Sequence, residues 1–284
     1  MISVIIPAYN EAAVIGRTLQ SVLKALQQEP GEILVVCNGC RDNTFDIASR
    51  FDAPVRVFNL EAGSKIAALN LGDREATHFP RFYLDADIEL SANALREVSN
   101  LLRTGNIHAA SPKMKCEMSA ASWPVRSFYR TWLSRPYHAA GHVGSGFVGI
   151  SQSGRDRFDE FPNIIADDEF VRRQFLPSER AIAHEANFTI RVPHDVHSLI
   201  KVKTRSRLGA RQLSQRFPEL ASNVRPDHAT KKYPAGRSEE NGIRPGILDK
   251  AVYGALCLAI RSRANRQYRE GSFSDWERDE TSRA

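Results

Sequence analysis

The chain has 284 residues, of which 42% are hydrophobic and 25% are charged, and its net charge is +6 at pH 7. This composition supplies a real core and is ordinary for a soluble protein, so the length allows one large α/β domain or one domain with an appendage. The excess of positive charge indicates anionic partners such as nucleotide phosphates, anionic lipid or nucleic acid, among which composition cannot choose.

Two classes of protein are excluded by pattern. No apolar run approaches the roughly 18 residues of a membrane span, and the N-terminus enters an apolar run without the basic region of a signal peptide. The four cysteines lack the pattern of a disulfide framework, so we expect a reducing, cytoplasmic compartment. Cys37 and Cys40 form Cys-x-x-Cys, but a zinc site would need a second pair or suitably spaced histidines, which leaves a redox-active pair as the alternative to ordinary thiols.

The first 87 residues alternate between two kinds of pattern. Short apolar, mostly β-branched runs predict four strands, the first stopped by Pro7, and helical spacing or helix-start signals predict three helices between them. The strands are expected at 2–6, 32–37, 55–58 and 82–84. The first helix is expected to begin at Asn10 or Glu11 and to be broken by Pro30-Gly31, the second to cover 44–51, and the third to open at 63–65 and continue through Leu71. This alternation is typical of a parallel sheet with right-handed crossovers, in which ligands lie at the carboxyl ends of the strands.

The pattern changes after residue 90. A helix over 92–102, a strand over 109–114, an aromatic helix over 123–137 and a strand over 181–192 are expected. The glycines between 141 and 149 either let the backbone approach a ligand or form a flexible loop.

The last third of the chain is basic. Residues 201–216 contain six Lys and Arg and no acid, which we interpret as a solvated or loop-borne surface that contacts diphosphate, with an anionic acceptor or a membrane as the alternative. Residues 222–245 indicate a linker, and the tail from Gly271 is expected to be disordered. The apolar stretch 251–260 is too short to span a membrane, so it is expected to pack as a helix or, alternatively, to lie at an interface.

The fourth predicted strand ends in Asp85, Ala86 and Asp87. Because residues i and i+2 of a strand point the same way, both carboxylates could converge just past the strand end. Oxygen ligands there suit a divalent cation and the phosphates that it carries. An isolated Asp-x-Asp is also a common polar turn, so this interpretation depends on the other motifs.

A second acidic group, Asp167, Asp168 and Glu169, stands at the apparent start of a helix. Acids there complement the helix dipole, and that alone could explain them.

Taken together, these segments resemble the family 2 glycosyltransferases, nucleotide-sugar enzymes of the GT-A fold. The matching segments come in the family's order: 4–11, 35–44, 63–70, the Asp85-Ala86-Asp87 motif, and Asp167-Asp168 where the family usually has Glu-Asp. The match is strong over 2–90, moderate to 216 and weak beyond it.

The resemblance implies an α/β, GT-A-type fold with a Rossmann-like, mostly parallel central sheet flanked by helices. The glycosyltransferase domain would cover 1–216, with a nucleotide-binding half over about 1–90 and an acceptor half over about 91–216. Residues 217–284 would form a C-terminal helical and extended appendage of linker, helix and polar tail.

The resemblance also implies roles for individual residues. Asp168 would be the general base, with Asp167 or Glu169 next in line, and Asn38 stands where many members have an aspartate that pairs with uracil. An amide can also donate and accept, but the change weakens the assignment to uracil. The donor would contact Pro7, Ala8, Tyr9, Glu11, Asn38, Lys65, Asp85, Ala86, Asp87, Gly144, Ser145 and Gly146.

The implied cofactor is Mn²⁺ or Mg²⁺, held by Asp87. His194 and His197 follow a predicted strand and are candidates for a further ligand, although a lone histidine is more often structural. The segment Arg205–Gly209 lacks the tryptophan found in processive members, so we do not expect a processive polymerase.

The predicted activity is an inverting transfer of a hexosyl group from a nucleotide-diphosphate sugar, with UDP as the expected nucleotide, to a hydroxyl acceptor. The acceptor would be a glycan, a lipid-linked precursor of the cell envelope or exopolysaccharide, or a small molecule. The protein would act in the cytoplasm, and its peripheral contact with the anionic inner face of the membrane is an open alternative. No specific nucleic-acid motif is present.

Two other functions remain as alternatives. One is a catalytically inactive scaffold that binds nucleotide sugar, which the presence of both carboxylate motifs disfavours. The other is a nucleotidyltransferase, which usually has a glycine-rich basic loop where this chain has Pro-Ala-Tyr-Asn-Glu.

Overall fold

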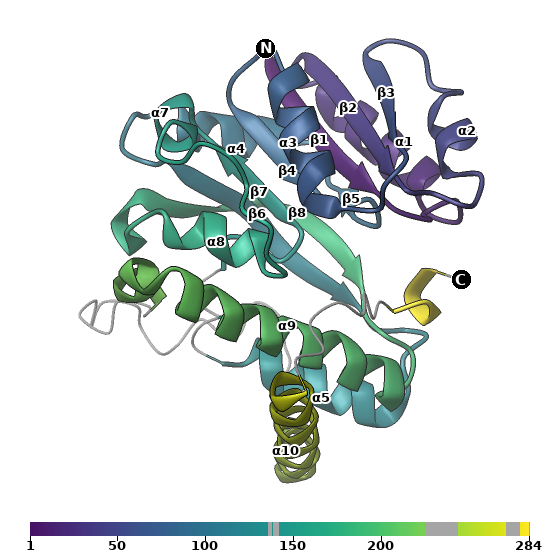
Figure 1. The fold of residues 1–284 in the computed structure, drawn as a ribbon, viewed down its shortest axis with the longest axis vertical. Coiled ribbons are helices and arrows are strands. Elements are labelled where there is room, and N and C mark those ends of the chain that lie inside the picture. Colours follow the sequence, from purple (N-terminus) through teal and green to yellow (C-terminus); the bar gives the residue numbers. More distant parts are fainter. Residues whose placement is uncertain (136–137, 139–141, 225–243, 271–278, 284) are drawn as a thin grey trace. The chain divides into compact units, whose positions relative to one another are not determined.

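The computed structural model describes residues 1–135, 138, 142–224, 244–270 and 279–283 (Figure 1). Its contacts divide the chain into two compact units that interleave in sequence. The first unit consists of Met1–Lys115, His142–Asn163 and Asp167–Ile190, and the second of Cys116–Gly141, Ile164–Ala166 and Arg191–Ala284.

The first unit is built on an eight-stranded sheet with the order β3-β2-β1-β4-β7-β6-β8-β5 in the described residues. The strands β3, β2, β1 and β4 are parallel, whereas β7 runs antiparallel to β4 and to β6, and β5 antiparallel to β8. The predicted α/β fold with a central sheet is therefore confirmed. The bounds are β1 (Ile2–Ala8), β2 (Gly31–Asn38), β3 (Val55–Leu60), β4 (Arg81–Leu84), β5 (Glu89–Leu90), β6 (Ala109–Glu117), β7 (Phe147–Ile150) and β8 (Arg180–Arg191).

Helices cover both faces of this sheet because alternate residues of the central strands point to opposite sides. Val4 and Ile6 of β1 share a core with α1 and α4, whereas Ile5 meets α3 on the other face. At Gly72 of α3 a Cβ atom would lie 2.5 Å from Ile5 Cγ2, so glycine is what lets this helix approach the sheet closely. The helices of this unit are α1 (Ile15–Leu26), α2 (Thr44–Ala48), α3 (Lys65–Glu75), α4 (Ala94–Leu102), α7 (Gln152–Arg155) and α8 (Asp167–Arg173).

The strand β1 does not stop at Pro7 as the sequence predicts, but continues to Ala8. The N–H of Ser3 points toward β4, where it donates to Pro80, and by the alternation of a parallel ladder Pro7 faces the same side. The pairing of β1 with β4 ends at Ile5 and Tyr83. The missing N–H of Pro7 therefore falls beyond the end of β4, where no ladder bond is lost.

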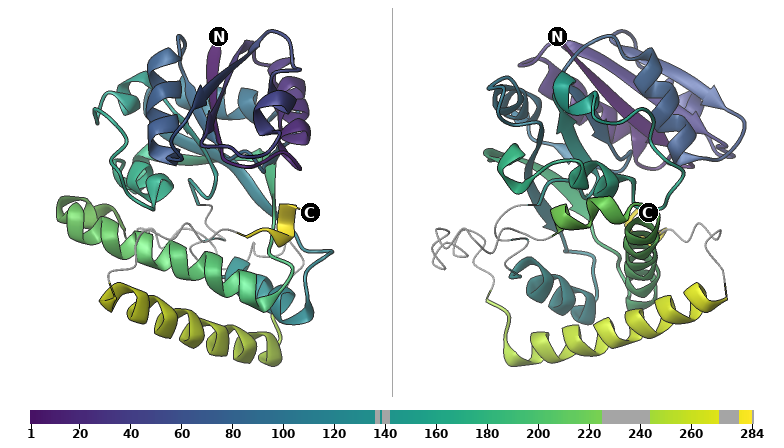
Figure 2. Two further views of the ribbon diagram at one scale, coloured as in Figure 1. Left: turned by 45° about the vertical axis from the view of Figure 1, so that its right-hand side comes forward. Right: turned by 60° about the vertical axis from the view of Figure 1, so that its left-hand side comes forward.

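The second unit is helical. Its core joins α5 to α9 and α10 through side chains that include Val125, Leu199 and Ile260, and Figures 1 and 2 show that α10 crosses α9. The basic run 201–216 lies in α9, so the prediction of a loop-borne surface is wrong; Asp195 caps this helix by accepting the Ser198 N–H at 2.8 Å. The elements are α5 (Trp123–Leu133), α9 (Val196–Arg216), η2 (Pro218–Val224), α10 (Ile247–Arg269) and η4 (Thr281–Arg283).

Several predictions fall on residues that the structure does not describe. Most of the linker expected at 222–245, the end of the aromatic helix at 136–137 and the tail over 271–278 lie outside the described residues. Within the described part of the chain, none of the helices combines the length and apolarity that a membrane span requires.

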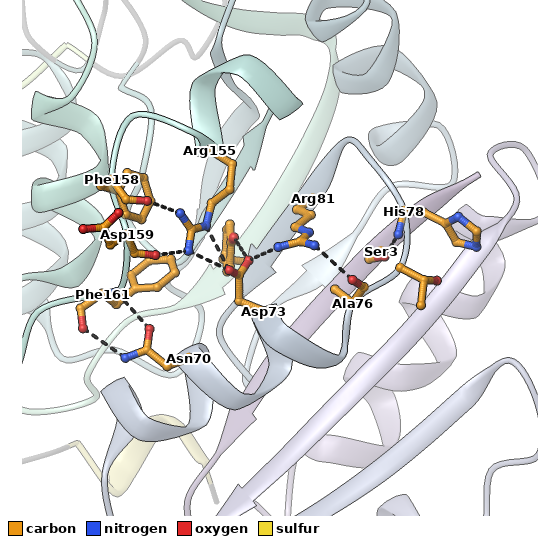
Figure 3. A network of polar contacts seen from close by, with 12 residues as sticks. Ser3, Asn70, Asp73, Ala76, His78, Arg81, Arg155, Phe158, Asp159 and Phe161 are labelled. Carbon is orange, nitrogen blue, oxygen red and sulfur yellow. Dashed lines mark hydrogen bonds and ion pairs between the residues drawn. The ribbon is translucent and has the colours of Figure 1, made fainter.

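One buried charge connects three elements of the first unit (Figure 3). Asp73 of α3 accepts from Arg81 Nη1 of β4 at 2.7 Å and from Arg155 Nε of α7 at 2.9 Å, and Tyr83 also donates to it. Burial alone would raise the pKa of Asp73, but these donors hold it below its ordinary value. Arg155 also donates to the carbonyl of Phe158, so the network extends into the loop after α7.

We expect Asp73→Asn to destabilise the protein by about 3–5 kcal/mol, because two buried guanidinium groups would lose their counter-charge. Urea unfolding monitored by circular dichroism measures this loss. The exposed pair of Glu75 with Arg56 is the matched control, and Glu75→Gln should cost at most about 1 kcal/mol. Because the folded-state pKa is lowered, the Asp73 contribution should be present above the ordinary value of 3.8 and disappear as the pH falls below it. Equal effects of the two variants would contradict this role.

Candidate active site

A pocket lies at the carboxyl ends of β1 and β4, in the first unit. Its empty volume is about 340 Å³, part of which is open to solvent, and it is bounded by the starts of α3 and α8 and by β7. Pro7, Phe161 and Val171 give it apolar walls. Its charged lining consists of Lys65, Asp85, Asp167 and Asp168.

Lys65 lies between two carboxylates. Its Nζ atom is 2.8 Å from Oδ1 of Asp85 and 2.9 Å from Oδ2 of Asp167. The lysine is the first residue of α3, where Ser64 caps the helix by accepting the Ala67 N–H. Burial alone would lower the pKa of Lys65, but the two carboxylates raise it above its ordinary value. The ammonium group therefore stays charged and joins α3 to the strand end of β4 and to the start of α8.

The three acids at the start of α8 have different environments. Asp167 is bound to Lys65, and Glu169 accepts from Arg172 and Arg173 at distances of 2.5–2.7 Å. Burial opposes ionisation of Glu169, yet its two arginines hold the pKa below the ordinary value.

Asp168 instead accepts hydrogen bonds from backbone groups, the Ser145 N–H on Oδ2 at 3.1 Å and the Glu169 N–H on Oδ1 at 2.8 Å. Its side chain keeps partial exposure, but the surrounding protein and then the charge of Asp167 raise its pKa to about 6. Among the three acids, Asp168 is therefore the one whose proton affinity suits a general base near neutral pH.

The tight turn formed by Gly144, Ser145 and Gly146 contacts both Asp168 and Asp85. Gly144, Ser145 and Gly146 have φ angles of +115°, +60° and +99°. The Ser145 N–H donates to Asp168, and the Gly146 carbonyl accepts the Asp85 N–H at 2.8 Å. A Cβ atom on Gly146 would lie 2.9 Å from Oδ2 of Asp85, so both the backbone conformation and the close approach require glycine. Strain of this kind is concentrated at functional sites.

The loops after β1 and β2 form the part of the edge where the resemblance places the nucleoside. Asn38 is only 3% exposed, and its Nδ2 donates to the Ala8 carbonyl at 2.8 Å. The Tyr9 ring lies against Gly63, at 3.4 Å from the position that a Cβ atom there would take. Glu11 is buried and its N–H donates to Thr44. The nucleoside contacts of these residues stay predictions.

The two cysteines of the Cys-x-x-Cys motif are free thiols, Cys37 in β2 and Cys40 in the loop after it. A hydrogen bond shared with Cys37 lowers the pKa of Cys40 to about 6, and the same bond, together with burial, raises that of Cys37. Cys40 also contacts the first loop, since its Sγ atom lies 3.4 Å from the Asn10 nitrogen and from the Ala8 oxygen.

The residues at the end of β4 fit a divalent ion that takes part of its ligands from phosphate. Asp85 and Asp87 are partly exposed oxygen ligands one residue apart, which is the donor set that Mg²⁺ and Mn²⁺ accept beside substrate phosphates. Among the described residues, no group of three or more His, Cys, Asp and Glu side chains is arranged to hold an ion by protein ligands alone. His194 and His197 belong to the second unit, and their role as ligands stays a prediction.

The structure therefore brings five of the predicted residues to one pocket: Pro7, Lys65, Asp85, Gly146 and Asp168. The others do not line it. Ala8 and Ala86 are buried, Gly144 and Ser145 form the adjoining turn, Asn38 is the last residue of β2, and Tyr9, Glu11 and Asp87 belong to the neighbouring loops.

Sequence analysis missed two further features of the site. It gave Asp167 no role beside Lys65, because that contact joins residues a hundred positions apart. It also missed Phe161, whose N–H and carbonyl are both bound by Asn70 of α3, at 2.8 and 3.1 Å. Asn70 lies within the segment 63–70 that carries the resemblance, which was the available signal.

The pattern that defines glycosyl transferase family 2 matches residues 3–158, more than half of the chain, and the protein belongs to this family. A curated relative, the glycosyltransferase AglD of Haloferax volcanii, is 29% identical over 118 residues. That match covers 39% of this chain and only 19% of AglD, so the chain spans about a fifth of the length of that relative.

Solved structures show the same GT-A fold at low sequence identity. The mannosyltransferase PcManGT from Pyrobaculum calidifontis, in complex with GDP-Man and Mn²⁺, has a TM-score of 0.59 and 19% identity, over 95% of this chain and 79% of that one. Glucosyl-3-phosphoglycerate synthase from Mycobacterium tuberculosis, with Mn²⁺ and UDP-Glc, has a TM-score of 0.53 and 19% identity, over 76% and 78%. The predicted family and GT-A fold class are confirmed.

We expect Gly146→Ala to weaken nucleotide-sugar binding at least about tenfold, because the added methyl group would displace Asp85 or the turn. Isothermal titration calorimetry with the donor that binds the wild type measures this change. Gly105→Ala is the matched control, since Gly105 also has a positive φ, of +84°, but no atom lies within 4 Å of an added Cβ. Both variants should lose some stability, and only Gly146→Ala should lose donor affinity. Unchanged affinity in Gly146→Ala would contradict the proposed place of this turn beside the donor.

Proposed function

We propose that the protein is an inverting hexosyltransferase that moves a sugar from a nucleotide-diphosphate sugar to a hydroxyl group of an acceptor. The proposal is carried by one observation: a charged lysine, two carboxylates bound to it and a third carboxylate with a raised pKa line a single pocket at the strand ends. Membership of glycosyl transferase family 2 supports this reading of the pocket.

The donor half of the site is assigned to residues 1–90. As the sugar leaves, negative charge grows on the β-phosphate oxygen of the nucleoside diphosphate. Lys65 would offset that charge, and its ion pairs with two carboxylates, which would hold the ammonium group in position before the donor binds, support this role. Asp87, with Asp85, would hold Mn²⁺ or Mg²⁺, which when bound supplies a Lewis acid for the diphosphate. The Mn²⁺ in the two related structures supports this cofactor.

The role of accepting the proton of the acceptor hydroxyl is assigned to Asp168. As the acceptor oxygen forms its bond to the anomeric carbon, the bond from that carbon to the phosphate oxygen breaks, and the hydroxyl proton passes to the Asp168 carboxylate. A single displacement of this kind inverts the anomeric centre. The Ser145 N–H fixes the orientation of the carboxylate, and the partial exposure of Asp168 leaves it open to the pocket.

UDP is the nucleotide that we propose, and GDP is the direct competitor, because the related structures contain UDP-Glc and GDP-Man. The acceptor is proposed to be a glycan, a lipid-linked precursor or a small hydroxyl compound. An inactive donor-binding scaffold is the second candidate function, and it differs from the first only in lacking turnover.

A thermal-shift panel with UDP, GDP, CMP and dTDP, each with and without Mn²⁺, tests the donor site. A ligand that binds the native state raises its stability by mass action, by about 2.7 kcal/mol at a concentration of 100 times Kd. We expect a metal-dependent rise in Tm with UDP, and no such rise in an Asp87→Asn variant. Asp52→Asn, an exposed aspartate in the loop after α2, is the matched control. No rise with any nucleotide in folded protein would contradict the proposal, whereas a rise without transfer to any acceptor would favour the scaffold.

Asp168→Asn should lower kcat by a factor of about 10²–10⁴, because it removes the base but keeps a side chain of the same shape. The thermal shift with donor should be retained. Asp167→Asn should behave in the opposite way, losing donor affinity through Lys65. Near-normal turnover in Asp168→Asn would transfer the assignment to another acid.

The same base predicts a pH dependence. Asp168 acts only when ionised, and because its pKa is raised to about 6, log(kcat/KM) of the wild type should fall as the pH drops through that value. Initial-rate measurements between pH 4.5 and 8.5 check this, and the residual rate of Asp168→Asn should lack that inflection.

A further inference from the structure

The two units carry opposite net charges. The second unit has 22 Lys and Arg against 12 Asp and Glu, a net charge of +10, whereas the first has 17 against 21, a net charge of −4. The whole excess of positive charge in the chain therefore belongs to the second unit, outside the pocket described above. A field of this sign attracts an anionic surface.

Helix α10 of this unit has an exposed apolar face. Ile247, Leu248 and Leu258 are 89%, 62% and 69% exposed, and they are among the few large hydrophobic residues that the described chain exposes to this extent. Three alanines on the same side of the helix are also exposed: Ala251 and Ala255, between Leu248 and Leu258, and Ala259, just after Leu258.

The opposite side of α10 is already used. Tyr253, Leu256 and Cys257 pack into the core of the unit around Ile260, and Ala264 is buried as well. The exposed residues are therefore not needed to attach the helix to its own unit, where α10 packs against α5 and crosses α9 (Figures 1 and 2).

Arginines follow the apolar residues along the same face. Ile247, Leu258 and Arg269 are spaced eleven residues apart, which is close to three helical turns, so they lie along one line of the helix. Arg261 and Arg266 are exposed beside that line. The apolar part, 247–259, is only about 18 Å long, which is too short to cross a bilayer.

We propose that this face of α10, defined by Ile247, Leu248, Leu258, Arg266 and Arg269, is a docking surface for an anionic lipid bilayer. The helix would lie in the plane of the membrane, with its leucine and isoleucine side chains in the boundary between headgroups and acyl chains. The arginines would reach lipid phosphates, for which their paired N–H groups are suited. Charge complementarity favours this occupant over a second copy of the chain, because two such surfaces would repel each other.

Sedimentation of the full-length protein with vesicles tests this proposal. We expect binding to vesicles of phosphatidylcholine with phosphatidylglycerol, much weaker binding to phosphatidylcholine alone, and a decrease as salt is raised from 0.1 to 0.5 M. No binding to the anionic vesicles at 0.1 M salt would overturn the proposal.

Two surface variants assign the binding to α10 without deleting the helix. Replacing Ile247, Leu248 and Leu258 together by Gln should weaken binding at least about tenfold. The double variant Arg266→Gln with Arg269→Gln should weaken it about 25-fold. The matched controls lie in the first unit: Leu176→Gln, at a leucine that is 53% exposed, and Lys24→Gln with Arg50→Gln, both exposed.

The remaining outcomes also decide the question. If the controls lower binding as much as the α10 variants, the attraction is a property of net charge and the docking surface is wrong. If size-exclusion chromatography shows a dimer that the triple Gln variant dissociates, and vesicles are not bound, the face belongs to a second copy. The α10 variants should keep the thermal shift with nucleotide, so loss of lipid binding and failure of the proposed transferase activity can be told apart.

Discussion

The position of Lys65 between Asp85 and Asp167 is the interaction on which the site depends. It joins the start of α3, the end of β4 and the start of α8, three segments that are distant in sequence. The carboxylate of Asp167 is ion-paired with Lys65, and that of Glu169 is ion-paired with Arg172 and Arg173. The acidic run is thus left with one carboxylate of raised pKa, that of Asp168, near the fixed positive charge of Lys65. Ion pairing, rather than residue type, therefore decides which acid has a raised pKa and which acids are held in ion pairs.

Much of the first unit could be predicted from the sequence because its signals are local. The short apolar runs fall within β1 to β4, and the helix start at Ser64 is a side-chain cap, so both can be recognised within a few residues. Asp85 and Asp168 were singled out for the same reason, as short motifs beside those elements. Their roles remain proposals. The carboxyl-edge rule for parallel strands accounts for the place of Asp85 in the pocket, whereas Asp168 enters it from the start of α8.

The features that could not be predicted depend on contacts between residues distant in sequence, or lie in segments whose composition is typical of another structure. The strand β7 follows a turn with three positive φ angles, so its glycines look like a loop, and only its antiparallel pairing with β4 and β6 shows that Phe147 to Ile150 is a strand. The basic run of α9 lacks a strong apolar period, and its helical state depends on packing within its unit. The contact of Asn70 with Phe161 joins residues 91 positions apart, beyond any local pattern.

The interleaving of the two units has a consequence for synthesis of the chain on the ribosome. The first unit is completed only by Asp167–Ile190, which contributes the strand β8, between β6 and β5, and the acidic start of α8. Residues 116–141 of the second unit emerge before that segment. The pocket therefore cannot form while only the first 115 residues have been made. The segment 116–141 of the helical unit likewise emerges before the rest of that unit is available to pack against it. Long-range closure of this kind slows folding and leaves unpaired strand edges exposed for longer. A nascent chain of this protein would accordingly be a stronger client for chaperones than a chain with its units in succession.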